Sequence, residues 1–147
     1  MAKLRLYTIG FTKKSAETFF GLLSKSDVRK VIDIRLNNSS QLAGFAKRDD
    51  LRFFLEAICG IGYVHMPRLG PTAEILDEYR KNGGEWDAYE DRFLELMSGR
   101  QIEKLLSKDE VDRACLLCSE DKPARCHRRL VAEYLRRRWG DLEIVHL

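Results

Sequence analysis

Short apolar runs alternate with helical stripes of apolar residues along the whole chain. The runs Leu4–Ile9, Val28–Arg35 and Asp112–Cys118 are rich in aliphatic and β-branched residues, and they predict three β-strands. Residues 62–66 and 143–146 predict two more. Because the core of the second run is continuously apolar, we expect it to be buried on both faces, as strands of parallel sheets are.

The segments between these runs carry apolar residues at the spacing of amphipathic helices. Ala16, Phe19, Phe20 and Leu23 follow the i, i+3, i+4, i+7 pattern, and Ser15 is suited to cap the start of that helix. Further helices are predicted over residues 51–58, from 71 onward, over 86–97, over 102–106 and over 125–139. Strands that alternate with helices favour a three-layer α/β/α single domain, residues 1–147, with a mostly parallel sheet of four to five strands.

Length and composition limit the class of protein. The 147 residues suffice for one domain, and 44% hydrophobic with 33% charged residues is typical of a globular chain. No apolar run approaches the roughly 20 residues of a membrane-spanning helix, so we expect no membrane partner. Residues 1–4 lead directly into the first strand without an apolar signal segment, and we therefore expect a cytoplasmic protein.

Positive charge is concentrated towards the end of the chain. The net charge is +3, from 26 Lys and Arg against 23 Asp and Glu. Residues 122–138 hold seven basic residues and one acid, a local charge of +6 that leaves −3 for the other residues. We expect the partner of this region to be an anionic small molecule or a nucleic acid. The alternative is a solvated helix face whose arginine stems cover apolar surface.

Polar residues follow the predicted strands directly. In parallel α/β sheets, ligands bind beyond the carboxyl ends of the strands, where this chain carries Gly10, Asp33, Arg35, Cys118 and Glu120. Asp33 lies within an apolar strand, and a buried carboxylate is costly without partners. Its natural partner is Arg35, in a buried ion pair that fixes the following loop. The alternative for Asp33 is a site carboxylate, and the same two interpretations apply to Glu120.

Three of the four cysteines and one of the three histidines lie within residues 115–127. Cys-x2-Cys followed by Cys-His suggests a metal site. However, Cys115 and Cys118 point to opposite faces of a regular strand, and zinc needs converging ligands. We therefore predict no bound metal or other cofactor, while a site formed by Cys118, Cys126 and His127 without Cys115 remains open.

The other interpretations of these cysteines are chemical and structural. Cys118 ends a strand, and Cys126 lies in the first turn of the predicted last helix, where free amides and the helix dipole stabilise a thiolate. Either thiol could then act as a nucleophile or redox group. Alternatively, these two cysteines form a disulfide between loop and helix. We expect Cys115 and Cys59 to be small core residues.

His127 lies on the apolar face of the last predicted helix. We expect its ring to point toward the sheet, at the end where the strand tips converge. The helix N-terminus favours a neutral imidazole that can donate or accept a proton, and a buried structural histidine is the alternative. Arg128 lies at the edge of the same face, whereas Arg129, Arg136 and Arg137 lie opposite and are expected to be solvated.

Five segments of the chain, taken together and in order, form one sequence pattern. They are residues 7–12, 31–35, 62–70, 116–120 and 126–128. The elements Leu-Leu-Cys-x-Glu and Cys-His-Arg are its most specific parts. Together the segments, which span nearly the whole chain, resemble domain-of-unknown-function family 488. The resemblance implies a compact α/β domain and no particular reaction. It implies functional positions at Gly10, Asp33, Arg35, Leu69, Gly70, Cys118, Glu120, Cys126, His127 and Arg128.

This chain departs from the family after the Asp-x-Arg element. Family members often have a proline and further basic residues there, whereas this chain has residues 36–40 with the sequence Leu-Asn-Asn-Ser-Ser. These residues open a long polar stretch that reaches residue 47, and long irregular loops on α/β scaffolds often carry function.

We predict a small enzyme with a pocket at the carboxyl ends of the strands. Its substrate contains phosphate or a nucleotide, and its reaction is hydrolysis or transfer at a phosphate or nucleoside bond. The residues expected to supply the nucleophilic or redox thiol and to move protons are Cys118, Cys126, His127, Asp33 and Glu120. The residues expected to hold the anion are Gly10, Arg35 and Arg128.

The alternative function is a nucleic-acid-binding or regulatory module. In that case the basic last helix contacts the nucleic-acid backbone, and the cluster of cysteines and histidine is structural. The two functions differ in their geometry. Only the enzyme needs Asp33, Cys118 and His127 within reach of one another.

Overall fold

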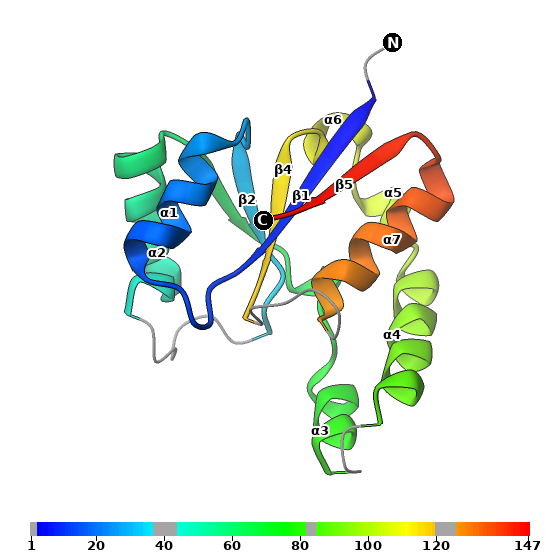
Figure 1. Cartoon of the computed structure of the whole chain (residues 1–147). Coiled ribbons are helices and arrows are strands. Elements are labelled where there is room, and N and C mark those ends of the chain that lie inside the picture. Colours follow the sequence, from blue (N-terminus) through cyan, green and yellow to red (C-terminus); the bar gives the residue numbers. More distant parts are fainter. Residues whose placement is uncertain (1–2, 37–43, 82–84, 120–125) are drawn as a thin grey trace.

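A parallel sheet forms the centre of the fold. The computed structural model describes residues 3–36, 44–81, 85–119 and 126–147. Within them five strands form one sheet in the order β3-β2-β4-β1-β5, and every pair of neighbours is parallel. β4 is therefore the central strand (Figure 1). The strands are β1 (Leu4–Gly10), β2 (Lys30–Asp33), β3 (Gly62–His65), β4 (Ala114–Cys118) and β5 (Leu142–His146).

Helices cover both faces of this sheet. The first face carries α1 (Ala16–Lys25), α2 (Arg48–Phe54) and the π-helical turn η2 (Leu55–Cys59), and the second carries α4 (Trp86–Arg100) and α7 (His127–Trp139) (Figure 1). This three-layer arrangement confirms the predicted fold class. The shorter helices are η1 (Gly44–Ala46), η3 (Pro67–Leu69), α3 (Ala73–Lys81), α5 (Ile102–Leu105) and α6 (Lys108–Val111).

Two hydrophobic cores form because successive side chains of a strand point to opposite faces. In β4, Leu116 lies in the core beneath α4 and α7, whereas Cys115 and Leu117 lie in the core beneath α1 and α2. All residues of β4 are buried, as expected for a central strand that is covered on both faces. Cys115 is fully buried, which confirms that it is a small core residue.

Local signals set the ends of the helices on the first face. Ser15 caps α1, because its side chain accepts a hydrogen bond from the backbone N–H of Thr18 at 3.1 Å. Gly60 ends η2 with a φ of 67°, which glycine adopts without steric cost. Cys59 was expected in the core but is only partly buried, and its Sγ lies 3.2 Å from Oγ of Ser24.

Several elements begin about two residues later than the sequence predicts, among them α7 and β4. α7 starts at His127 with Cys126 as its N-cap, so the expectation that Cys126 lies in the first turn of a helix that begins at 125 is wrong. The backbone of Cys126 is extended, with φ −137° and ψ 139°, which is typical of an N-cap. β4 starts at Ala114 because Arg113 has a φ of 59° and turns the chain after α6.

The helices are too short or too polar for a bilayer. Within the described residues, none is both long and apolar enough to cross a membrane.

Candidate functional site

The carboxyl ends of three strands meet at one edge of the sheet. Gly10, the last residue of β1, pairs in register with Cys118, and Asp33, the last residue of β2, pairs with Leu117. The backbone N–H of Ile34 donates to the carbonyl of Leu117 at 3.1 Å, which extends the pairing past the end of β2. Because β4 lies between β1 and β2, Cys118 lies between the other two strand ends.

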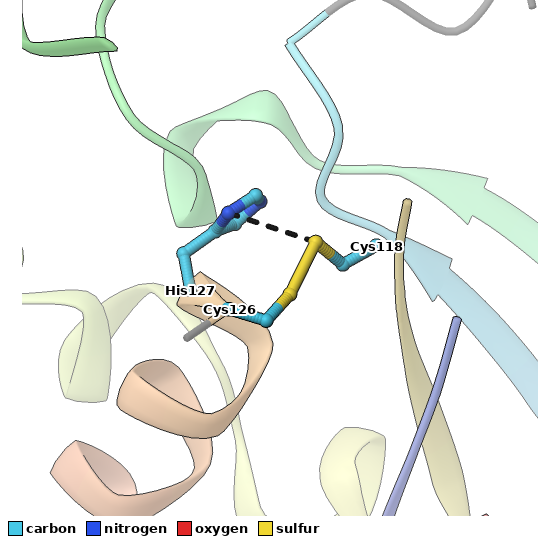
Figure 2. A group of neighbouring side chains, drawn as sticks. All are labelled: Cys118, Cys126 and His127. Atoms are coloured by element: carbon cyan, nitrogen blue, oxygen red, sulfur yellow. Dashed lines mark hydrogen bonds between the residues drawn. A yellow bond between two sulfur atoms is a disulfide. The ribbon is translucent and has the colours of Figure 1, made fainter. Parts of the chain in front are cut away.

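Cys118, Cys126 and His127 form a compact group at this edge (Figure 2). The structure joins the two sulfur atoms as a disulfide, with the Cα atoms 7.3 Å apart. Nδ1 of His127 lies 3.6 Å from Sγ of Cys118. One sulfur or ring nitrogen from each of the three residues lies within 4.8 Å of the others. The strand end and the start of α7 therefore bring two sulfurs and an imidazole together, as the positions of these residues predicted.

His127 has few polar contacts. Its ring points toward the sheet, as predicted, and packs against the ring of Phe93 with the centroids 5.8 Å apart. Nε2 is buried and makes no hydrogen bond to any described residue. Burial lowers the pKa of His127 to about 4, and the positive charge of Arg128 lowers it as well. The imidazole is therefore neutral at neutral pH.

Asp33 is fully occupied by hydrogen bonds. Its Oδ1 accepts from Nε of Arg35 at 2.8 Å and from the backbone N–H of the same residue at 3.1 Å. Its Oδ2 accepts from Nη2 of Arg35 at 2.8 Å and from the hydroxyl of Tyr63 at 2.5 Å. Both partners of the ion pair are buried, so the structure contains the buried pair that the sequence offered as one interpretation of Asp33.

The surroundings of this ion pair keep the carboxylate of Asp33 ionised. Burial by itself raises the pKa of Asp33, but the hydrogen bonds and charge of Arg35, with the hydroxyl of Tyr63, outweigh burial and leave the pKa below its ordinary value. Asp33 is therefore ionised, with both oxygens engaged. An engaged carboxylate is suited to orient Arg35 rather than to move a proton.

Arg35 reaches across the end of the central strand. It follows β2, and its guanidinium carbon lies 5.2 Å from the ring centroid of Phe11, which follows β1. Because β4 lies between these two strands, the guanidinium lies across the end of β4, where Cys118 is. Nη1 of Arg35 is buried and makes no hydrogen bond to any described residue. Within the described residues, one donor of this arginine is therefore unpaired at the edge of the sheet where β4 ends.

Arg128 is more deeply buried than its place on the helix predicts. Its side chain is 0% exposed, whereas the helical pattern puts it only at the edge of the apolar face. Burial lowers the pKa of His127 and that of His146, and the charge of Arg128 lowers both further. The next residue, Arg129, was expected to be solvated, but its Nη1 lies 3.1 Å from Oε2 of Glu133. Arg136 and Arg137 are exposed, as predicted.

A family model described as "Domain of unknown function DUF488" matches residues 15–135. The chain belongs to this family. The matched range includes Asp33, Arg35 and the whole Cys118–Arg128 segment, while Gly10 precedes it. Neither the curated proteins nor the solved structures contain a match.

Gly70 is one of the positions that the resemblance to DUF488 implied, and the structure shows why a glycine lies there. A Cβ at Gly70 would collide with the backbone carbonyl oxygen of Ile34. The carbonyls of Arg68 and Gly70 accept hydrogen bonds from Nη1 of Arg100, at 2.6 and 3.0 Å. Leu69 is fully buried between them. Residues 67–70 therefore pack directly against the chain that leaves β2 at the site.

Sequence reasoning missed three residues that shape the site. Tyr63 binds Asp33, Phe11 lies under Arg35, and Phe93 packs on His127. Tyr63 was detectable only with the strand order, because its contact depends on β3 lying next to β2. Glu120 and the polar loop residues 37–43 lie outside the described residues, so their predicted roles stay predictions.

The exposed end of α7 has mixed charge. Arg137 and Arg138 line a surface cavity of about 640 Å³ together with Asp91 and Glu95. Nε of Arg138 also lies 3.7 Å from Oε2 of Glu103. The acids offset part of the positive charge that the sequence places on this helix.

Proposed function

We propose that this DUF488 chain is an enzyme that acts on an anionic substrate, one that contains phosphate or a nucleotide, at the carboxyl end of its sheet. The observations that support it are a cysteine and a histidine in contact, and two buried nitrogens at this end of the sheet, Nη1 of Arg35 and Nε2 of His127, that make no hydrogen bond to any described residue. Buried polar atoms without hydrogen bonds are uncommon in native proteins. A ligand that accepts hydrogen bonds would satisfy both.

Cys118 is the proposed nucleophile. The thiol proton passes to Nδ1 of His127, which lies 3.6 Å from Sγ. The thiolate then attacks phosphorus or the carbon of a nucleoside bond. A bond to sulfur forms, the bond to the leaving group breaks, and the leaving group takes the proton back from the imidazole. Water then releases the second product, as in other enzymes that form a covalent intermediate.

Cys126 has a supporting role in this scheme. As the N-cap of α7, it lies next to the free backbone amides and positive dipole end of the helix, which favour negative charge on the nearby sulfur. In the structure its sulfur is joined to that of Cys118 as a disulfide. The reaction needs both thiols reduced, which agrees with the cytoplasmic location that we propose.

Positive charge next to Cys118 would hold the substrate anion. Arg35 offers Nη1, and Asp33 fixes the orientation of its guanidinium through Nε and Nη2. Arg128 adds a buried positive charge close enough to lower the pKa of His127. Gly10 provides backbone without a side chain directly beside Cys118. Asp33 is a positioning residue in this proposal, and Glu120 keeps its predicted role as a proton carrier.

The nucleic-acid alternative depends on the basic end of α7. Asp91 and Glu95 share a surface cavity with Arg137 and Arg138, and this mixed charge favours the enzyme over a backbone-binding helix. The alternative predicts oligonucleotide binding that weakens as salt rises. Binding of this kind, unchanged in Cys118→Ser, would support the alternative instead.

A substrate panel tests the proposal. Reduced full-length chain is incubated with phosphate monoesters, phosphodiesters, nucleotides and nucleosides, and product release is measured. Cys118→Ser is expected to lower turnover by more than about a thousandfold, as loss of a nucleophile does in other enzymes. Cys59→Ser, which changes a thiol on the other face of the sheet, is the matched control and should retain activity. Equal turnover in both variants would overturn the proposal.

A further inference from the structure

The group formed by Cys118, Cys126 and His127 has the donor atoms that zinc prefers. Two sulfurs and one imidazole nitrogen come from the end of β4, the N-cap of α7 and the first residue of α7. Cysteine sulfur and histidine nitrogen are the usual ligands of Zn²⁺ in proteins. The three donor atoms lie within 4.8 Å of one another. They therefore converge, which the Cys-x2-Cys pair on β4 does not.

Two distances fit one shared ion. Sulfur and imidazole ligands of a tetrahedral zinc lie roughly 3.5 Å apart, and Sγ of Cys118 lies 3.6 Å from Nδ1 of His127. The Cα atoms of Cys118 and Cys126 are 7.3 Å apart, whereas most disulfides have Cα separations below about 6.8 Å. Two cysteines that share an ion can have a wider backbone spacing, because the metal lies between their sulfurs.

The charges of such an ion and of its own ligands balance at this buried position. Cys118 and Cys126 are each 1% exposed, and unpaired charge is costly at such a depth. Two thiolates would offset the two positive charges of Zn²⁺, and neutral His127 would complete three ligands without adding charge. The fourth position of a tetrahedral site would then be left for water or an anion.

We propose that the reduced chain binds one Zn²⁺ through Cys118, Cys126 and His127, and that bound zinc inhibits the enzyme reversibly. The two thiols release their protons to solvent when zinc binds, the imidazole binds in its neutral form, and no electrons are transferred. The inhibition rests on the proposed function, because it follows from Cys118 being the nucleophile. The binding itself does not depend on it.

Titration of the reduced, metal-free chain with Zn²⁺ alone tests the binding. A competing chromophoric chelator should report one tightly bound ion per chain. Co²⁺ in place of Zn²⁺ should give a thiolate-to-cobalt charge-transfer band and the visible bands of tetrahedral cobalt. Oxidation to the Cys118–Cys126 disulfide should abolish both signals. Sub-stoichiometric binding, or a cobalt spectrum without the charge-transfer band, would overturn the proposal without any variant.

Single substitutions locate the site. Cys118→Ser, Cys126→Ser and His127→Gln should each weaken zinc binding by more than about tenfold. Cys59→Ser and His146→Gln are matched controls for thiol and imidazole, and they should bind zinc as the natural chain does. Circular dichroism confirms that each variant is folded. Unchanged affinity in the first three variants would assign the metal to other residues and overturn the proposal.

The inhibition is measured separately from the binding. Zn²⁺ added to the active, reduced enzyme should stop turnover of the substrate found in the panel, and a chelator should restore it. Zinc that binds at one ion per chain and leaves turnover unchanged would overturn the inhibition but not the binding. Equal turnover in Cys118→Ser and Cys59→Ser would overturn the proposed function. The zinc titration would still decide whether the metal binds, because it does not depend on turnover.

Discussion

Two buried polar groups lie next to each other at the carboxyl end of the sheet, and they differ in how well their hydrogen bonds are satisfied. In the first, Asp33 accepts four hydrogen bonds from Arg35 and Tyr63. In the second, His127 has a buried Nε2 without a partner among the described residues, and its Nδ1 lies 3.6 Å from Sγ of Cys118. We call the first the closed group, because the hydrogen bonds of its carboxylate are made. We call the second the open group, because a buried nitrogen of its imidazole has no hydrogen bond to the described residues.

This difference distinguishes residues that stabilise the fold from residues that take part in the proposed reaction. A buried carboxylate with all its bonds made stabilises the fold and fixes the arginine that it binds. An imidazole whose buried Nε2 makes no hydrogen bond to any described residue contributes little to stability through that nitrogen, which can instead meet a ligand. We therefore expect substitutions in the Asp33–Arg35 pair to change the free energy of unfolding most, and substitutions at Cys118 or His127 to change function instead.

Breaking the closed group should have the largest effect on stability. Arg35→Met leaves the carboxylate of Asp33 buried without its cation, and it should lower the free energy of unfolding by about 3–5 kcal/mol. Urea denaturation measures this loss. Arg48→Met removes the arginine of an exposed pair with Asp49 and should cost less than about 0.5 kcal/mol. Similar losses in the two variants would contradict the distinction between the two groups.

Adding a side chain at Gly70, which packs against the chain that leaves β2 at the site, should have the next largest effect on the free energy of unfolding. Gly70→Ala puts a Cβ against the carbonyl oxygen of Ile34, and it should lower the free energy of unfolding by about 1–3 kcal/mol. Gly21→Ala in the middle of α1 meets no atom within 4 Å. That control should raise stability by about 0.5–1 kcal/mol, because alanine favours helix. If Gly70→Ala and Gly21→Ala changed the free energy of unfolding by the same amount in the same direction, Gly70 would have no packing role.

The closed group should also give stability a defined dependence on acid. The pKa of Asp33 is lower in the folded chain than the ordinary value of about 3.9. The unfolded chain therefore takes up the proton first, so this contribution is complete above about pH 4 and is lost as the pH falls through the folded pKa. The stability difference between the natural chain and Asp33→Asn, measured by urea denaturation, should be constant from pH 7 to 5 and shrink below pH 4. A difference that grows in acid would reverse this assignment.

The open group should have the smallest effect on stability. His127→Gln removes no hydrogen bond between Nε2 and any described residue, and it should change the free energy of unfolding by less than about 1 kcal/mol. The same variant should lose turnover, because the proton acceptor of Cys118 is gone. Thermal unfolding and the substrate assay, run on one preparation, measure both. A large loss of stability would place His127 with Asp33 among the structural residues.

The sequence predicted most of what depends on position along an element. The apolar runs and helical stripes led to the parallel sheet, and the rule that ligands bind at carboxyl ends of strands led to Asp33, Cys118 and His127. The pairing of Asp33 with Arg35 was also among the expectations, because a carboxylate in an apolar strand needs a nearby cation.

The sequence could not predict what depends on strand order or depth. The contact between Tyr63 and Asp33 requires β3 to lie beside β2, and periodicity does not fix the order of strands. Arg128 was placed at the edge of an apolar face, because a helical pattern gives the direction of a side chain and not how deeply the helix is buried. The start of α7 was misplaced because Cys126 is not one of the residues that commonly cap helices.

A structure of the reduced chain with an inorganic oxyanion, vanadate or tungstate, tests the central claim most directly. The account predicts one oxyanion at the carboxyl end of β4, within bonding reach of Sγ of Cys118. Its oxygens should lie about 3 Å from Nη1 of Arg35 and from Nε2 of His127. An oxyanion bound elsewhere at saturating concentration, with these two nitrogens still unpaired, would contradict the account.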